Sequence, residues 1–243
     1  MTSAGLDARR VIMNARHRGR CNVDEYAAKQ ILSAYGVAVP RSIYVEGSDQ
    51  LGQALDGITP PFVLKIVSPD ILHKSDSGGV RLGLMDSDAI YVAMRQMANS
   101  ASREGYRVDG FLIEETARTG HDMVVGGVRD PGFGPVLMLG LGGIFVEVLR
   151  DVAFRICPIS RLDAREMVQE LKGAPILAGA RGNIAISEDS LIDSLMAIGG
   201  KDGLLLDLSD ELAEVDINPL IVSDTGAVAV DARFILTSNS DEF

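Results

Sequence analysis

Glu214-Val215-Asp216-Ile217-Asn218-Pro219-Leu220, followed by Asp231, is the stretch of this chain that decides the fold. It predicts a strand, a turn at residues 223–226 and a second strand over residues 227–236. Successive side chains of a strand point to opposite faces, and Val215 and Ile217 are apolar. We therefore expect Glu214, Asp216 and Asn218 to share the polar face.

The length of the turn sets which residues face each other. If its two central residues are Asp224 and Thr225, counting outward places Asn218 opposite Asp231. A carboxylate and an amide oxygen side by side suit Mg²⁺, with substrate phosphates completing its shell. The alternative is an ordinary hairpin with a polar solvent face, and a slip of one residue would separate the pair.

Composition and charge narrow the class of protein. The chain has 243 residues, 47% of them hydrophobic and 23% charged, with a net charge of −11. Such an acidic chain is not expected to bind nucleic acid or acidic membranes in general. Cys21 and Cys157 match no metal spacing and are expected as free thiols. The longest apolar run, 136–146, is shorter than the ~20 residues of a membrane helix. We expect a cytoplasmic protein.

Strands and helices alternate along the chain, which predicts an α/β or α+β fold. The joint between two subdomains is expected near residues 115–120. The first twenty residues contain five arginines and one acid, which favours a cationic surface helix over an organelle transit peptide. Expected strands cover 42–45, 62–67, 80–84, 110–115, 123–128 and 136–141, and expected helices cover 24–35, 87–103, 160–172 and 187–199.

Two segments of the first half could carry chemistry. Lys65 lies mid-strand, where a cation calls for an anion unless it is an edge lysine reaching water. The loop at 68–80 holds His73, Lys74 and the pair Gly78-Gly79. It could approach a phosphate through backbone amides, and its His could accept a phosphoryl group or transfer a proton. The alternative is an exposed polar loop.

Other polar groups are open to two interpretations. Glu114 or Glu115, at the end of an apolar strand, could bind a ribose hydroxyl or be a solvated charge. Glu147, Asp151 and Arg155 interrupt an apolar stretch, as either a polar face or a substrate wall. The cluster Gly140-Leu141-Gly142-Gly143 allows a close backbone approach, but glycine clusters also serve packing.

Together these segments resemble the ATP-grasp part of the NDP-forming acyl-CoA synthetases. The resemblance is to the β subunit of ADP-forming acetate–CoA ligase and, more distantly, of succinyl-CoA synthetase. It runs from about residue 10 to 236 and rests most on the His73-Lys74-Ser75-Asp76 loop and on Asp216-Ile217-Asn218-Pro219-Leu220. The other matching segments are 24–37, 63–66, 130–135, 147–148, 179–182 and 231–233.

The resemblance implies an ATP-grasp fold whose two subdomains hold ATP or ADP between them. The expected division is an N-terminal helical extension at 1–23, a first subdomain at 24–115, and a second at 116–243 with the metal-binding hairpin. Lys65 would contact phosphates, Glu114-Glu115 would form the adenine-side hinge, and Gly78-Gly79 would lie in the loop at the nucleotide. Asn218 and Asp231 would hold Mg²⁺ with Asp216 nearby, and His73 would relay the phosphoryl group. Asp122 would also contact the nucleotide, and it stands where the family usually has Glu, which is one methylene longer.

The family reaction interconverts acyl-CoA, ADP and phosphate with the acid, CoA and ATP, through an acyl phosphate and a phosphohistidine. The main phosphohistidine and the CoA site belong to an α subunit, so this chain is expected to be one subunit of a hetero-oligomer. Two other functions remain open. They are a stand-alone ATP-grasp ligase that joins a carboxylate to an amine, and a non-catalytic regulatory subunit, which would not need Lys65, His73, Asn218 and Asp231 together.

Overall fold

The computed structural model describes residues 2–71, 74, 77–143, 150–180 and 185–238. The chain divides into two compact units, Pro40–Ala117 and Met1–Val39 with Arg118–Phe243. The boundary between Ala117 and Arg118 falls inside the expected stretch 115–120. The other boundary differs from the expectation, because residues 24–39 belong to the larger unit and not to the first subdomain.

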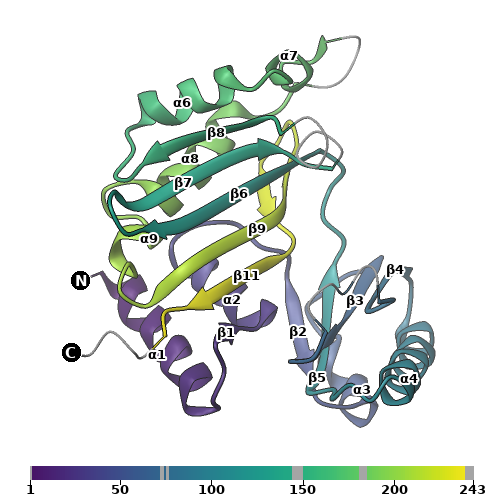
Figure 1. The fold of residues 1–243 in the computed structure, drawn as a ribbon. Helices are drawn as coiled ribbons and strands as arrows, with labels where there is room; N and C mark the ends of the chain where they lie inside the picture. Colours follow the sequence, from purple (N-terminus) through teal and green to yellow (C-terminus); the bar gives the residue numbers. More distant parts are fainter. Residues whose placement is uncertain (1, 72–73, 75–76, 144–149, 181–184, 239–243) are drawn as a thin grey trace. The chain divides into compact units, whose positions relative to one another are not determined.

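The smaller unit is a four-stranded antiparallel sheet in the order β2-β5-β3-β4, together with helices α3 and α4 (Figure 1). Its apolar cluster joins alternate strand residues, such as Leu64, Ile66 and Ile113, to one face of α4. Lys65, which alternates with Leu64 and Ile66, therefore points to the opposite face of the sheet. The elements are β2 (Ser42–Val45), α3 (Leu51–Ala54), β3 (Phe62–Val67), β4 (Val80–Leu84), α4 (Ser87–Arg103) and β5 (Gly110–Glu115).

The larger unit is built on a seven-stranded antiparallel sheet in the order β1-β11-β9-β6-β7-β8, with β10 paired to β9. Helices pack on one face of this sheet, and Figure 1 shows α8 and α2 behind its strands. The strands are β1 (Asn22–Val23), β6 (His121–Asp130), β7 (Gly134–Leu141), β8 (Val152–Ile156), β9 (Leu212–Val222), β10 (Ala227–Ala229) and β11 (Ala232–Leu236). We call the other face of the sheet the open face.

Some helices of the larger unit begin at a residue whose side chain caps them. Asp24 caps α2 (Glu25–Ala34) by accepting from the Ala27 amide, and Ser160 forms a capping box with Asp163 at α6 (Arg161–Glu170). The remaining helices are α1 (Ser3–His17), α7 (Ala174–Leu177), α8 (Glu188–Gly199) and α9 (Leu204–Asp207). Among the described residues no helix is both long and apolar enough to cross a membrane.

Helix α1 is the expected cationic helix, but it is tied to the larger unit. Ala8 and Ile12 are buried in the core of that unit. The Arg9 guanidinium donates to Glu211 at 2.7 Å and to the Asp207 carboxylate at 3.3 Å. Helix α2 belongs to the same core, where Lys29 and Glu25 form a buried ion pair at 2.7 Å. Because both helices pack here, α1 is not a separate extension and α2 is not part of the smaller unit.

Candidate functional site

The hairpin formed by β9, β10 and β11 has the register that the turn predicts. Val222 pairs with Ala227 beside the turn, and Ile217 pairs with Ala232 beyond it. Between these pairs the backbone amide of Asn218 donates to the backbone carbonyl of Asp231 at 3.1 Å. Asn218 and Asp231 therefore face each other, as expected.

Both strands of the hairpin change face at this pair. In β9 the buried residues are Val215 and Ile217 before the pair but Leu220 and Val222 after it. The second strand shows the same break, with Ala229 and Ala232 buried on its two sides, and it is why β10 and β11 are separate elements. The pairing of β9 with β6 shifts by one residue at the same place, which is a β-bulge. The bulge marks Asn218 and Asp231 as the point where regular pairing stops.

A second polar pair lies next to the first. Arg233 is directly opposite Asp216, and each is two residues from Asp231 or Asn218 along its strand. Residues two apart on a strand share a face and lie about 7 Å apart, while opposite side chains have Cβ atoms about 5 Å apart. Asp216, Asn218, Asp231 and Arg233 thus form a two-by-two block on the open face, which we call the polar block.

Charge in the polar block is not evenly balanced. Burial raises the pKa of the Asp216 carboxyl, the nearby Glu214 carboxylate raises it further, and Arg233 opposes both. Arg233 is half-buried, and its Nε atom is inaccessible to solvent and has no hydrogen-bond partner among the described residues. From sequence, Arg233 was only part of the matching segment 231–233. Its position two residues after Asp231 could have placed it on the same face of the sheet as Asp231.

The polar block fits a magnesium ion that shares its shell with a substrate. It offers an amide oxygen and carboxylate oxygens, and Mg²⁺ is usually held by one or two carboxylates together with substrate phosphates and water. No cluster of three or more His, Cys, Asp or Glu side chains suited to a metal occurs in the part of the chain that is described. The donor set therefore suits a metal ion that is also bound by a phosphate. It does not suit a structural metal that is held by protein ligands alone.

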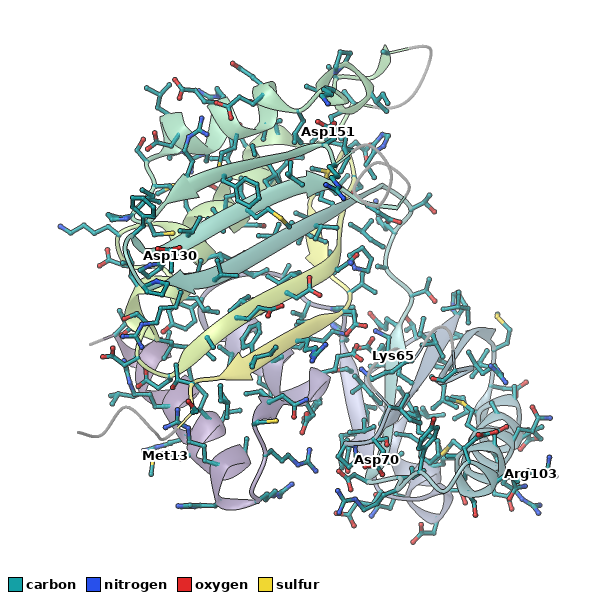
Figure 2. All side chains as sticks on the ribbon, in the orientation of Figure 1. Met13, Lys65, Asp70, Arg103, Asp130 and Asp151 are labelled. Carbon is teal, nitrogen blue, oxygen red and sulfur yellow. The ribbon has the colours of Figure 1, made fainter. Side chains whose placement is uncertain are left out.

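Lys65 of the smaller unit forms an ion pair, as expected for a lysine in the middle of a strand. Its ammonium lies 3.0 Å from the Glu114 carboxylate, with side chains that are 5% and 1% exposed. Figure 2 shows Lys65 on β3, and Glu114 lies on the adjacent strand β5, opposite Val63. The two expected site residues are thus brought together. A buried lysine held by a carboxylate has a defined position, unlike an edge lysine that reaches water.

Glu115 has a different environment from Glu114. Its carboxylate accepts hydrogen bonds from the Thr59 amide at 2.9 Å and from the Thr59 hydroxyl at 3.0 Å. The Glu115 amide in turn donates to the Arg41 carbonyl at 3.0 Å. These contacts attach the end of β5 to the two neighbouring segments, and the nucleotide role of Glu115 stays a prediction.

The loop between β3 and β4 is described only in part. His73 lies outside the described residues, so its expected role is a prediction. Gly78 has a φ of +68°, a left-handed conformation that favours glycine. The Gly79 amide donates to the Lys74 carbonyl at 2.6 Å, and a Cβ at Gly79 would lie 2.8 Å from Ile66. Backbone geometry and packing explain this glycine pair, and phosphate binding by it stays a prediction.

Asp122 is an exposed residue near the start of β6. It pairs with Ile221, and its carbonyl accepts from the Gly142 amide at 2.7 Å. A Cβ on Gly142 would lie 2.9 Å from the Asp122 Cβ and carbonyl oxygen, so only glycine fits at this position. The exposed carboxylate of Asp122 is available to a ligand, and its nucleotide contact remains a prediction.

In the stretch 147–155, the charged residues Asp151 and Arg155 make contacts within the protein. Asp151 accepts from the amides of Lys172 and Gly173 at 2.8 and 2.9 Å, which secures the start of α7. Arg155 pairs with Glu170 and Glu166, and these neighbours raise the pKa of its guanidinium. Glu147 lies outside the described residues. The substrate-wall interpretation therefore gains no support from Asp151 or Arg155.

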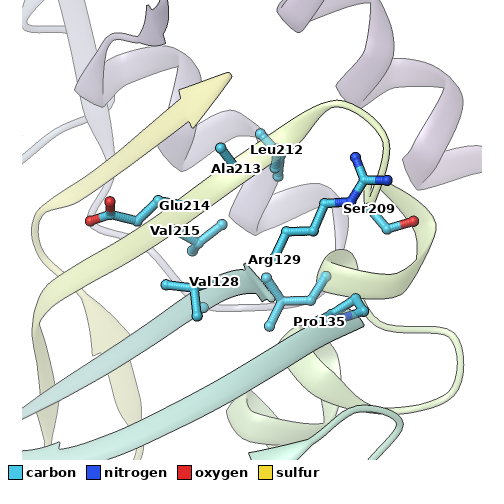
Figure 3. A pocket seen from close by; sticks show the side chains of 10 residues that line it. Val128, Arg129, Pro135, Ser209, Leu212, Ala213, Glu214 and Val215 are labelled. Carbon is cyan, nitrogen blue, oxygen red and sulfur yellow. The ribbon is translucent and has the colours of Figure 1, made fainter. Parts of the chain in front are cut away.

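One hollow of the structure lies apart from the expected site residues, and another is lined in part by the expected pair Gly78-Gly79. Figure 3 shows one between the ends of β6 and β9, beside Arg129, Ser209 and Glu214, with about 10 Å³ of free volume, enough for one water. The other, of about 320 Å³, lies in the smaller unit and includes Ile66 and Met97. Because Ile66 faces α4, this cavity is on the opposite side of the sheet from Lys65.

Comparison with known proteins identifies relatives over nearly the whole chain. The family profile of the ATP-grasp domain matches residues 14–236. The β subunit of ADP-forming acetate–CoA ligase I from Pyrococcus furiosus is 42% identical over 94% of this chain and 97% of its own length. ADP-forming acetate–CoA ligase I from Archaeoglobus fulgidus is 40% identical over 85% of this chain, which corresponds to only 30% of that protein.

The fold is also that of a solved relative. A chain of the dinucleotide-forming acetyl-coenzyme A synthetase 1 from Ca. Korarchaeum cryptofilum, in complex with coenzyme A and Ca-AMPCP, superposes with a TM-score of 0.88 at 36% identity. The match covers 95% of this chain and 100% of that one. The same synthetase, solved with Mg-AMPPCP and a phosphohistidine segment pointing towards the nucleotide binding site, matches with a TM-score of 0.80. The expected ATP-grasp fold is confirmed.

Proposed function

This chain belongs to the ATP-grasp family and, within it, to the β subunits of the ADP-forming acetate–CoA ligases, and from this premise we propose that it is the nucleotide-binding subunit of an ADP-forming acyl-CoA synthetase. The complete enzyme would interconvert acyl-CoA, ADP and phosphate with the acid, CoA and ATP. One observation carries the proposal: the hairpin register sets Asn218 opposite Asp231 on the open face of the larger sheet.

Asn218 and Asp231 would hold Mg²⁺ together with the nucleotide, and Asp216 would stand beside them. When bound, the ion neutralises charge on the phosphates during phosphoryl transfer. The contribution of the chain is to aim the two oxygen ligands at one point. The backbone amide of Asn218 holds the two residues side by side through its 3.1 Å hydrogen bond to the backbone carbonyl of Asp231. The bulge beside β6 keeps both side chains on the open face.

Lys65 would contact the nucleotide phosphates as a positive point charge. Its Glu114 partner, 3.0 Å away, keeps the ammonium in place before the nucleotide binds. Positioning of this kind lowers the ordering cost that a flexible lysine would otherwise meet on binding. Glu114-Glu115, Asp122 and Gly78-Gly79 are the further candidate contacts to the nucleotide.

His73 would relay the phosphoryl group. In the direction of ATP synthesis, a phosphorus–nitrogen bond to this imidazole breaks as a phosphorus–oxygen bond to ADP forms. We propose that the smaller unit is the first ATP-grasp subdomain and the larger unit the second, with α1 and α2 added to the latter.

A partner subunit would supply the rest of the enzyme. The chain corresponds to 97% of a relative named as a β subunit but to only 30% of a single-chain relative of the same ligase type. We infer that the remaining part, which would carry the CoA site and the main phosphohistidine, is a separate α subunit in a cytoplasmic hetero-oligomer.

Calorimetry of the full chain with Mg²⁺-ADP and Mg²⁺-ATP tests the proposal. Wild-type protein should bind both, and Asn218→Ala should weaken binding at least about 10-fold, since it removes a charge-assisted contact. Asp224→Asn, at an exposed position in the turn of the same hairpin, is the matched control and should bind like wild type. Absence of binding by wild-type protein, alone and with its co-purified partner, would refute the proposal.

A further inference from the structure

We infer that Arg233 is a phosphate-binding residue of the polar block, so that the site on the open face consists of a metal pair, Asn218 and Asp231, and an arginine beside it. This inference rests on the proposed nucleotide-binding function and assigns a further residue to it. The evidence is the position of Arg233, its missing hydrogen-bond partner, and the charge of its neighbours.

The backbone places Arg233 on the open face beside the metal pair. It is directly opposite Asp216, and buried Ala232 separates it from Asp231 in the strand. Asp231 and Arg233 therefore point to the same side of the sheet, about 7 Å apart. A ligand that reaches both oxygen ligands of the metal pair comes within reach of a long arginine side chain.

One hydrogen-bond donor of Arg233, its Nε, has no acceptor among the described residues. This Nε atom is also buried. Asp216 is opposite but does not form an ion pair with it among the described residues, although the two charges interact at longer range. Buried donors are nearly always satisfied in native proteins, so an orphan donor in a candidate site points to a ligand.

The chemistry of guanidinium selects the class of ligand. Arginine presents planar donors that match two oxygens of a phosphate or carboxylate, and its pKa keeps it charged at any physiological pH. The neighbouring acids Glu214 and Asp216 would repel an anion unless a cation balances them. A phosphate of the nucleotide fits this setting, because Arg233 supplies the positive charge on the side of the block away from Asn218.

The test measures Mg²⁺-ADP affinity of the full chain by calorimetry. Arg233→Gln should raise Kd about 10- to 100-fold, the loss expected for charge-assisted hydrogen bonds. Arg233→Lys should recover part of the affinity, because it restores the charge without the planar donors. Salt should weaken wild-type binding more steeply than binding by Arg233→Gln, because the variant has one contact charge fewer.

Arg16→Gln is the matched control. Arg16 lies in α1 of the same unit, and its buried Nε also has no partner in the described part of the chain. The substitution removes the same charge, but the Arg16 guanidinium donates to Thr237, away from the open face. It should bind Mg²⁺-ADP within about 2-fold of wild type. Equal affinities of Arg233→Gln and Arg16→Gln would overturn the inference.

A double variant separates phosphate binding from charge balance. If Arg233 only offsets Asp216, then Asp216→Asn combined with Arg233→Gln should bind as tightly as Asp216→Asn alone, and this result would also overturn the inference. If Arg233 contacts the phosphate, the double variant stays weak. Failure of wild-type protein to bind at all would instead refute the proposed function, and the inference with it.

Discussion

The buried pair Lys65–Glu114 allows stability and nucleotide binding to be separated. At 3.0 Å and an effective dielectric constant of about 20, Coulomb's law gives an attraction of about 5–6 kcal/mol, most of which offsets the loss of hydration. Removing one partner leaves the other charge buried without this 3.0 Å contact. We expect Lys65→Met and Glu114→Gln each to lower the free energy of unfolding by about 3–5 kcal/mol.

The double variant should behave differently in the two measurements. Lys65→Met with Glu114→Gln removes both charges, so most of the stability should return, as is common when a buried pair is replaced as a whole. Nucleotide affinity should not return, because the phosphate contact of Lys65 is still missing. The double variant is therefore expected to be stable and unable to bind Mg²⁺-ADP.

The assays are thermal unfolding and calorimetry on the same preparations. For a chain of this size, 1 kcal/mol shifts Tm by about 2–4 °C, so each single variant should lose roughly 6–20 °C. Lys201→Met, at an exposed lysine, is the control and should change neither Tm nor affinity. Wild-type affinity in the double variant would refute the reasoning, since Lys65 would then serve only the fold.

Two further predictions concern packing and a buried thiol. Gly142→Ala should lower Tm, because the added Cβ would lie 2.9 Å from the Asp122 backbone oxygen. Overpacking of this kind costs about 1–3 kcal/mol. An unchanged Tm would show that β6 can move aside. Burial raises the pKa of the Cys157 thiol to about 11, whereas Cys21 is exposed, so a thiol reagent at pH 8 should label Cys21 alone in the native chain. The unfolded Cys157 ionises near its ordinary pKa, so stability should fall as the pH rises from about 9 towards 11, and Cys157→Ser should flatten that fall.

Much of the larger sheet and of its candidate metal pair could be predicted from sequence. Alternating apolar residues in 214–222, a two-residue turn and helix caps such as Ser160 are local signals. The expected single strand at 227–236 is interrupted in the structure, because Val230 and Asp231 continue the break in alternation that begins at Asn218 and Pro219. The two-residue strand β1 was missed, since so short a segment has no period of its own.

What the sequence by itself determined is therefore the hairpin and the pair Asn218–Asp231, because the turn sets their register within a few residues of chain. Only the tertiary structure decided which anion holds Lys65. Glu114 reaches it because β5 inserts between β2 and β3, an order that depends on pairing between distant segments. The same holds for α2, whose amphipathic sequence requires a core to pack on but does not specify which of two cores that is. Likewise, only the tertiary structure shows that the buried Nε of Arg233 has no acceptor among the described residues.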